Sequence, residues 1–281
     1  MTYAERVWMI TGAGRGLGHA FARAALEAGD RVVATARRPD ALGELAAAHP
    51  ERAVVLPLDV TDRSAVFSTI ERANAAFGRL DVVVNNAGYG LLGAIEELTE
   101  AEARAQLETN VFGALWVTQA VLPHMRARRS GHIVQVSSVG GVGSMPTFGL
   151  YNASKWALEG FSEALAAEVA PFGVRVTIAE LGGFATDWAW RSMRFATPLP
   201  AYDGLRESLF GSARVPWDMS HQASDTSADP AEAASALVAH VRRDDGPLRL
   251  LIGDDAPEHV RMALERRRDD YRRDGRFRWP V

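Results

Sequence analysis

The chain has 281 residues and no cysteine. This absence excludes disulfide bonds, thiolate catalysis and metal sites with cysteine ligands. Its seven histidines are scattered, and we find no spacing of histidines and carboxylates that is typical of a metal site. We therefore expect no metal to take part in the chemistry of this protein.

Strong charge and long apolar runs are missing as well. The formal net charge is −4, which gives no electrostatic reason to expect nucleic acid as a partner. No apolar run is long enough to cross a bilayer, and residues 1–6 lack the regions of a signal peptide. We therefore expect a cytoplasmic protein that does not enter a membrane.

What the chain does contain is an alternation of short β-rich runs and alanine-rich amphipathic segments. Strands rich in valine, isoleucine and leucine, each followed by a helix, predict a parallel sheet covered on both faces. No internal repeat or low-complexity linker divides the sequence, so we expect one doubly wound α/β domain over residues 1–281. The predicted strands are 7–11, 31–36, 53–58, 82–85, 132–137, 174–179 and 248–252, and the predicted helices include 16–28, 63–77, 100–128, 152–170 and 230–242.

Two segments depart from this alternation. Residues 182–229 carry several tryptophans and prolines and no clear strand. Because this long irregular segment follows the sixth strand, it should leave the C-terminal edge of the sheet, where ligands of such folds bind. We predict a lid over the substrate, with a subunit-contact loop as the alternative. Residues 257–278 mix arginine with aspartate and glutamate, which predicts a solvated helix with ion pairs.

A glycine-rich turn, Thr11 to Gly18, follows the first strand and opens the first helix. Glycines let the backbone turn tightly and approach a pyrophosphate, and the helix N-terminus offers unpaired N–H groups and a positive dipole end. The alternative is a tight strand–helix turn with no ligand. The residues of this turn predicted to contact a dinucleotide are Gly12, Arg15, Gly16, Leu17 and Gly18.

The end of the second strand indicates which nucleotide is preferred. An acid at this place would bind a ribose 2′-hydroxyl, but here Arg37 and Arg38 follow the strand. Guanidinium groups pair well with phosphate, so we predict a preference for NADP(H) over NAD(H), with Arg15 able to reach the same group. The alternative is that both arginines are merely solvated. Further predicted cofactor contacts are Asp59 and Val60 at the adenine ring, and Asn86, Ala87 and Gly88 at the adenine ribose.

A proton-transfer site is indicated by Tyr151 and Lys155, which share one face of a predicted helix. A free phenol has a pKa of about 10, and a nearby ammonium lowers it, so Tyr151 could exchange a proton while a nicotinamide exchanges hydride. Ser138, just past a strand end, could hydrogen-bond the substrate oxygen, and Asn110 could hold a water that links Lys155 to solvent. Alone, such a tyrosine–lysine pair is common on helix surfaces.

Thr11 to Gly18, Asp59, Asn85 to Gly88, Asn110, Ser138, Tyr151 and Lys155 together resemble the short-chain dehydrogenases/reductases, over essentially the whole chain. The resemblance implies a Rossmann-like seven-stranded sheet and a catalytic tetrad of Asn110, Ser138, Tyr151 and Lys155. It also implies that Tyr151 and Lys155 lie against the cofactor, with Lys155 on the nicotinamide ribose. A homodimer or homotetramer without a catalytic metal is implied too. The Ala36-Arg37 pair resembles that of NADP-preferring members.

One position departs from the family pattern. Members commonly carry Pro-Gly after the sixth strand, whereas this chain has Leu181 before Gly182. Proline fixes φ, so leucine loosens the turn and adds bulk, and the nicotinamide end could be more mobile or reshaped. Gly182 and Thr186 remain at the positions where the family contacts the nicotinamide.

The predicted substrate pocket is apolar and carries no obvious anchor for a carboxylate or phosphate. Its predicted residues are Gly140, Met145, Phe148, Phe184 and Trp188, with Trp190 and Met193 as further candidates. Such a lining favours a hydrophobic ketone or aldehyde, or the corresponding alcohol, although Arg191 and Arg194 nearby leave an acidic substrate open. The leading hypothesis is an NADPH-dependent carbonyl reductase. The alternatives are an NAD-dependent hydroxysteroid or secondary-alcohol dehydrogenase and a non-catalytic NADP sensor, while a dehalogenase would not need the glycine-rich turn or Lys155.

Overall fold

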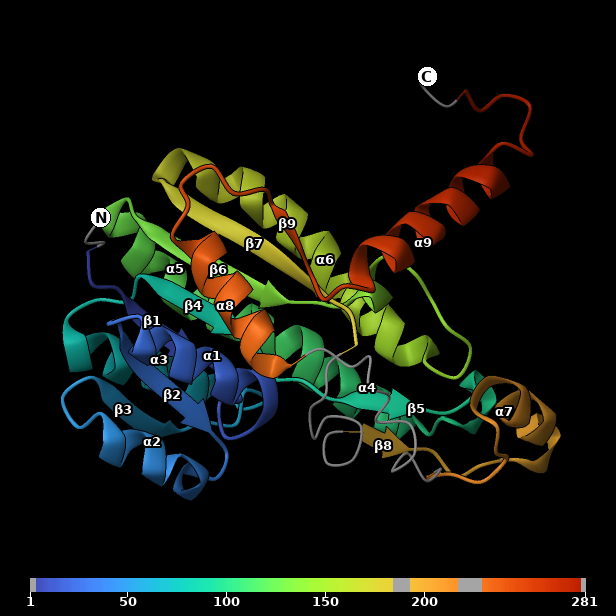
Figure 1. Ribbon diagram of the computed structural model, residues 1–281, viewed down its shortest axis with the longest axis horizontal. Helices are drawn as coiled ribbons and strands as arrows, with labels where there is room; N and C mark the ends of the chain where they lie inside the picture. The colour runs from blue at the N-terminus through green and yellow to red at the C-terminus, as the bar shows by residue number, and fades with distance from the viewer. Residues whose placement is uncertain (1–3, 184–192, 217–228, 279–281) are drawn as a thin grey trace.

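A seven-stranded parallel sheet forms the centre of the protein (Figure 1). The computed structural model describes residues 4–183, 193–216 and 229–278. The strands occur in the order β3-β2-β1-β4-β6-β7-β9, which confirms the predicted doubly wound Rossmann-like fold. Their bounds are β1 (Val7–Ile10), β2 (Arg31–Ala36), β3 (Ala53–Pro57), β4 (Val82–Asn85), β6 (Gly131–Val136), β7 (Val174–Leu181) and β9 (Arg249–Ile252).

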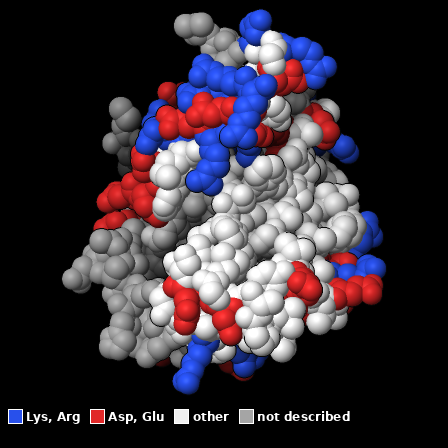
Figure 2. All heavy atoms as spheres, turned by 90° about the vertical axis from the view of Figure 1, so that its right-hand side faces the viewer, with Lys and Arg blue, Asp and Glu red and all other residues white. Residues whose placement is uncertain are grey.

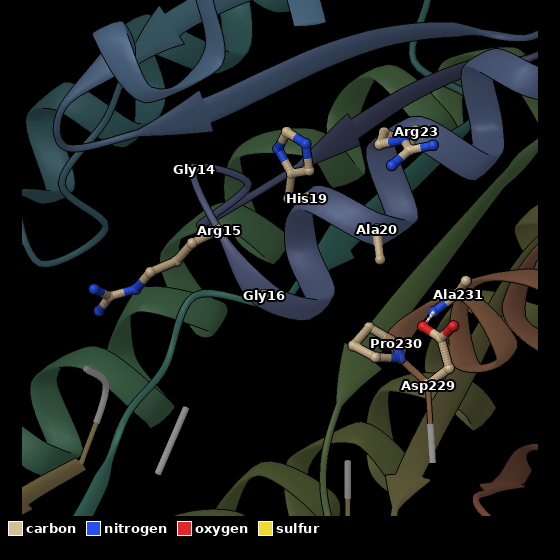
Figure 3. Close-up of a pocket in the computed structure, with 9 residues that line it drawn as sticks. All are labelled: Gly14, Arg15, Gly16, His19, Ala20, Arg23, Asp229, Pro230 and Ala231. Atoms are coloured by element: carbon tan, nitrogen blue, oxygen red, sulfur yellow. Dashed lines mark hydrogen bonds between the residues drawn. The ribbon is translucent and has the colours of Figure 1, made fainter. Parts of the chain in front are cut away.

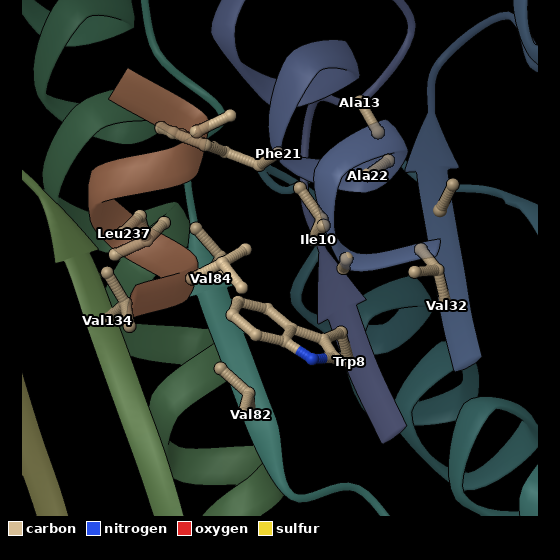
Figure 4. Packing of buried hydrophobic residues seen from close by; sticks show 14 of the residues in the cluster. Trp8, Ile10, Ala13, Phe21, Ala22, Val32, Val82, Val84, Val134 and Leu237 are labelled. Carbon is tan, nitrogen blue, oxygen red and sulfur yellow. The ribbon is translucent and has the colours of Figure 1, made fainter. Parts of the chain in front are cut away.

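Helices cover both faces of this sheet. On one face, α1 (Gly16–Glu27) and α8 (Pro230–Val241) pack side by side, and α2 (Gly43–Ala48) lies near the β3 edge. On the other face lie α3 (Arg63–Phe77), α5 (Gly113–Arg128) and α6 (Gly149–Val169). Both faces of the strands are therefore apolar, as in the cluster around the buried Trp8 in Figure 4. The indole N–H of Trp8 donates to Asp30 Oδ2 over 2.9 Å, so its one polar atom is satisfied.

The segment after β7 contains regular structure that the sequence did not reveal. β8 (Met193–Phe195) pairs in parallel with β5 (Gly90–Leu92), and α7 (Asp203–Phe210) follows. The prediction that 182–229 contains no strand is therefore wrong. A strand of three residues has too short a pattern to be recognised, and this one is stabilised by a partner far away in the sequence. The proposed lid depends on residues 184–192 and 217–228 as well, which lie outside the described residues.

Helix α9 (Ala256–Tyr271) extends away from the body of the protein near the C-terminus (Figure 1). Arg261 pairs with Glu258 and Glu265 along its surface, which confirms the prediction of a solvated helix with ion pairs. Arg267 lies 4.5 Å from the ring centroid of Trp156 and so ties α9 to α6. Within the described residues, no helix is long and apolar enough to cross a bilayer, and no group of three or more metal-ligating side chains is positioned to hold an ion.

A chain of hydrogen bonds, whose first part has a direction fixed by Arg175, lies in the interior near the N-terminal end of β6. Arg175 donates to His132 Nδ1 (2.8 Å), so His132 carries its proton on Nε2 and donates to Thr177 Oγ1 (2.8 Å). Thr177 Oγ1 also makes a hydrogen bond with His240 Nε2 (2.9 Å). Burial, reinforced by Arg175, lowers the pKa of both histidines. Both rings are therefore neutral in the folded protein.

Candidate active site

The glycine-rich turn forms a cradle that no larger residue would fit. A Cβ atom at Gly18 would lie 2.4 Å from Asn86 Nδ2 and 2.6 Å from Gly12 O, well inside contact distance. Gly12 and Gly16 have φ values of 66° and 55°, which favour glycine. The backbone therefore stays bare in front of the N-terminus of α1, and this is the geometry that a pyrophosphate requires. These residues fit a dinucleotide.

The turn after β4 closes onto this cradle. Thr11 Oγ1 accepts hydrogen bonds from the backbone N–H groups of Asn86 and Ala87, both at 3.0 Å. The Asn86 amide in return donates to Thr11 O (2.9 Å) and Gly12 O (3.2 Å). The predicted cofactor residues at the ends of β1 and β4 thus form one hydrogen-bonded unit, although they lie far apart in the sequence.

Arg37 lines an open hollow of about 440 Å³ at the ends of β2 and β3. The hollow is also lined by Pro57, Leu58, Asp59, Ala65, Ser68, Thr69 and Arg72. Arg72, from α3, is a second cation here that sequence reasoning missed, because its position in a helix gave no signal. Asp59 turns its carboxylate to the Thr61 hydroxyl (2.8 Å), and Val60 is buried. Arg38 is exposed and is not one of the residues that line this hollow in the described part of the chain.

A second hollow, of about 360 Å³, lies between the glycine-rich turn and the start of α8 (Figure 3). Gly14, Gly16, His19 and Arg23 line one side, and Asp229 to Ala231 line the other. The Arg15 side chain extends away from Asp229 and Pro230 in this view.

The predicted proton-transfer residues meet at the end of β6. Tyr151 is hydrogen-bonded to Ser138, and Ser138 Oγ accepts the backbone N–H of Gly140 (3.1 Å). The Lys155 ammonium lies 5.8 Å from the centroid of the Tyr151 ring and donates to Val136 O (2.7 Å). Lys155 is only 7% exposed. Tyr151, Ser138 and Lys155 therefore form one compact group.

The structure does not support the predicted lowering of the Tyr151 pKa. Burial raises the pKa of Tyr151 to about 12, and the hydrogen bond with Ser138 offsets only part of this effect. Desolvation disfavours the phenolate, because a charged group loses more on leaving water than a neutral one does. Burial also lowers the pKa of Lys155 to about 8, against the opposing effect of Glu159. The phenol is therefore protonated at neutral pH.

Asn110 lies in a π turn, Glu108–Phe112, between α4 (Glu100–Leu107) and α5. The predicted helix 100–128 thus exists but widens at this residue, as helices often do at functional sites. The Asn110 amide accepts the N–H of Tyr89 (3.1 Å) and donates to Tyr89 O (3.0 Å) and Ser154 Oγ (3.1 Å). Asn110 therefore joins the turn after β4 to α6, and its role in holding a water remains a prediction.

Only part of the predicted substrate pocket lies within the described residues. Phe148 packs edge-on against Tyr151 with ring centroids 6.2 Å apart, and a Cβ at Gly140 would lie 3.4 Å from Tyr151 Cε1. Met145 is 42% exposed and its N–H donates to Asn152 Oδ1 (3.2 Å). Phe148 and Gly140 therefore lie beside the phenol, and Met145 is tied to Asn152, the residue that follows Tyr151. Phe184, Thr186, Trp188, Trp190 and Arg191 lie outside the described residues.

The turn at Leu181 is held from another part of the chain. Leu181 is buried in the apolar cluster under α8, and the N–H of Gly182 donates to Ile252 O (2.9 Å). The next N–H, of Gly183, donates to both carboxylate oxygens of Asp255, at 3.0 and 3.3 Å. Asp255 therefore restrains the backbone of this turn, where Leu181 stands in place of the proline that is common in the family. Sequence reasoning missed this residue because it lies far along the chain.

Comparison with known proteins identifies the family. The model of the short chain dehydrogenase family matches residues 6–195. The oxidoreductase BOA17 of Botryotinia fuckeliana is 42% identical over 92% of this chain and 93% of the relative. A short-chain dehydrogenase structure from Streptomyces avermitilis has 43% identity, a TM-score of 0.86 and 96% coverage of both chains. Another, from Burkholderia cenocepacia in complex with NADP, has 26% identity, a TM-score of 0.75 and coverage of 97% and 98%. This chain therefore belongs to the short-chain dehydrogenase family and is an NAD(P)-dependent oxidoreductase.

Proposed function

We propose that this protein reduces a hydrophobic ketone or aldehyde to the alcohol, with NADPH as the hydride donor and Tyr151 as the proton donor. The observation that carries this proposal is the half-buried Tyr151 phenol, which is hydrogen-bonded to Ser138 and whose pKa is raised to about 12. A phenol that keeps its proton at neutral pH is the form needed to protonate a carbonyl oxygen.

The side chains divide the work as follows. A bound nicotinamide supplies the hydride that the carbonyl carbon accepts. Tyr151 gives its proton to the carbonyl oxygen, and the Ser138 hydroxyl, held by the N–H of Gly140 (3.1 Å), orients that oxygen. The phenolate that results is stabilised by the nearby Lys155 ammonium until it is protonated again. Asn110 keeps the turn after β4 in register with α6.

The test of the chemistry is Tyr151→Phe, which removes only the hydroxyl. Turnover should fall by about 100-fold or more, the usual contribution of a general acid, while NADPH binding measured by fluorescence is retained. Tyr271→Phe is the matched control, since Tyr271 is 55% exposed on α9. Retained activity in Tyr151→Phe would refute the role of the phenol.

The preference for NADPH is a separate proposal that rests on Arg37 and Arg72, two cations in the hollow at the ends of β2 and β3. Two guanidinium groups in one hollow at the end of the second strand support recognition of a 2′-phosphate there. Arg37→Glu should weaken NADPH binding far more than NADH binding, whereas Arg38→Glu, with the same change of charge beside the hollow, should have a smaller effect. An equal loss for both nucleotides in Arg37→Glu would contradict this proposal.

An apolar substrate is favoured by Phe148 beside the phenol, by the exposed Met145 nearby in the chain, and by the contact that Arg194 makes. Of the two arginines that left an acidic substrate open, Arg194 is the described one, and its guanidinium lies 4.6 Å from the centroid of the Tyr89 ring, so it already has a contact. We would measure NADPH and NADH oxidation against aldehydes, aryl ketones, steroids and keto esters. Turnover only with charged substrates would contradict the proposal of an apolar substrate. A clear preference for NADH would favour the alternative function, a secondary-alcohol dehydrogenase.

Self-association is proposed from the surface. Figure 2 shows that the end of the molecule carrying α7 and α9 presents a broad face without charged side chains, bordered by charged ones. Large apolar side chains that are exposed in the single chain include Ile95 (69%), Met262 (46%) and Trp156 (44%). A second copy of this chain would bury such groups. Light scattering should give the mass of a dimer or tetramer, and a monomer at micromolar concentration would refute this.

A further inference from the structure

Three consecutive residues at the end of β6 are each held by a side chain of α6. Val136 O accepts from Lys155 Nζ (2.7 Å), the Ser137 hydroxyl donates to Glu159 Oε1 (2.7 Å), and Ser138 is hydrogen-bonded to Tyr151. Tyr151, Lys155 and Glu159 succeed one another at four-residue intervals, so they lie on one stripe of the helix. The first two belong to the proposed chemistry, and Glu159 is the remaining member of the set.

Glu159 is buried, and its surroundings are charged. It is 5% exposed, and a Cβ at Gly141 would lie 2.2 Å from its Oε1, so the backbone after Ser138 closes directly over the carboxylate. On its other side, Arg249 Nη2 approaches Glu159 Oε2 to 3.4 Å. Arg249 also contacts Glu180 (2.8 Å), which is fully buried, and Glu163 (2.8 Å), whose side chain is 54% exposed. One guanidinium thus faces three carboxylates.

Lys155 is a buried ammonium, and a nearby counter-charge favours its protonated form. It is the only lysine among 31 basic residues, all others being arginine, and an ammonium loses its proton on burial more readily than a guanidinium does. The single lysine of the sequence is the one that lies beside the Tyr151 phenol. The presence of only one lysine in the sequence thus indicates the same residue that the structure places beside Glu159 and Tyr151 on one helix.

We propose that Glu159 is a positioning residue that keeps the buried Lys155 protonated and holds the end of β6 against the helix of Tyr151. The role of Lys155 in chemistry rests on the proposed function, but the effect of Glu159 on Lys155 does not. Glu159 acts through Lys155 and Ser137 and does not touch the substrate. Around it, the facing charged and titratable groups are Lys155 and Glu163 from α6, Glu180 from β7 and Arg249 from β9.

The protonation states agree with this arrangement. Burial lowers the pKa of Lys155 to about 8, and Glu159 is the charge that resists this fall. Burial raises the pKa of Glu159 overall, and the hydrogen bond from Ser137 and the charge of Arg249 offset part of this rise. Burial and the neighbouring Glu159 together raise the pKa of Glu180 to about 7. Of the two buried acids, Glu159 is therefore the better supported as a carboxylate, because it has a hydroxyl donor as well as Arg249.

The single lysine makes the proposal directly measurable. Protein labelled with ¹³C at lysine Cε gives one side-chain NMR signal, whose titration reports the protonation of Lys155 alone. Glu159→Gln should move the midpoint to lower pH by about one unit, the usual effect of one neighbouring charge. Glu163→Gln is the matched control, because Glu163 binds the same Arg249 but is half-exposed, and it should leave the midpoint unchanged.

Ser137→Ala is a second, milder variant that decides the matter if Glu159→Gln does not fold. It removes the hydroxyl that favours the Glu159 carboxylate, so the midpoint should fall by less than in Glu159→Gln. An unmoved lysine midpoint in either folded variant would overturn the proposal, as would an equal shift in Glu163→Gln. Because this titration needs no substrate, absence of reductase turnover in the unaltered protein would count against the proposed function and not against Glu159.

Discussion

The buried ion pair of Arg206 and Glu97 gives the sharpest test of how the segment after β8 is held near the substrate edge. Their side chains are 1% and 2% exposed. Besides Glu97, Arg206 donates to Leu199 O (2.7 Å) and Ala213 O (3.0 Å), so it binds both ends of the segment that contains α7. Burial opposes ionisation of Glu97, but hydrogen bonds from Leu199 N–H and Arg206 outweigh it and lower its pKa.

The perturbation is Arg206→Met, which keeps the apolar length and removes the guanidinium. Glu97 is then left without its cation, and breaking one side of a buried pair costs about 3–5 kcal/mol. For a protein of this size, that corresponds to a fall in the melting temperature of roughly 6–20 °C. Asp203→Asn is the matched control, because Asp203 binds the same Arg206 at 2.6 Å but is 50% exposed. An exposed pair contributes about 0–1 kcal/mol, so this variant should melt close to the unaltered protein.

Thermal unfolding followed by circular dichroism measures the difference. Adding Glu97→Gln to Arg206→Met should recover part of the loss, since the uncompensated buried charge is then removed. Substrate KM should rise in Arg206→Met while NADPH affinity is retained, because the pair lies away from the glycine-rich turn. If Arg206→Met melts no lower than Asp203→Asn, the pair does not stabilise the segment and the reasoning is refuted.

Two further predictions concern the nicotinamide turn and acid stability. Asp255→Ala removes both hydrogen bonds to Gly183 N–H and should raise the KM for NADPH several-fold in steady-state kinetics. His259→Ala, which removes only a neighbour of that carboxylate (3.4 Å), should leave this KM unchanged. If the KM for NADPH is the same in Asp255→Ala as in the unaltered protein, the anchor is unnecessary. His132 is neutral in the folded protein because burial and then Arg175 depress its pKa, whereas an unfolded histidine takes up a proton below a pH of about 6.5. Stability should therefore fall as the pH drops below about 6.5, by up to about 1.4 kcal/mol per unit for this group, and His132→Gln should flatten the dependence of melting temperature on pH; an equally steep profile would contradict it.

Much of the fold could be read from local sequence because its signals are local. Seven short apolar runs predicted the strands of the sheet, and the glycine-rich turn was placed correctly between β1 and α1. β5 and β8 could not be predicted, because each is three residues long and is defined only by the other. The π turn at Asn110 was also hidden, since its hydrogen bonds run to Tyr89 and Ser154.

The candidate site divides in the same way. Residue type and spacing sufficed to nominate Ser138, Tyr151 and Lys155, because the chemistry requires a hydroxyl, a phenol and an amine on a strand end and one helix face. The protonation of these groups could not be read, because it depends on burial. The expected low pKa of Tyr151 gave way to a pKa of about 12 once the phenol was enclosed.

By itself, the sequence determined the parallel sheet, the bare glycine cradle and the identity of the side chains available for proton transfer. Each of these follows from residues close together in the chain, through hydrophobic periodicity, backbone freedom or intrinsic reactivity. Only the tertiary structure decided that Asp255 anchors Gly183, that Arg72 joins Arg37 and that Glu159 lies behind Lys155 with Arg249. Those contacts join residues from different elements, which only folding brings together. Desolvation and charge act through space, so their effect on a side chain depends on the folded structure.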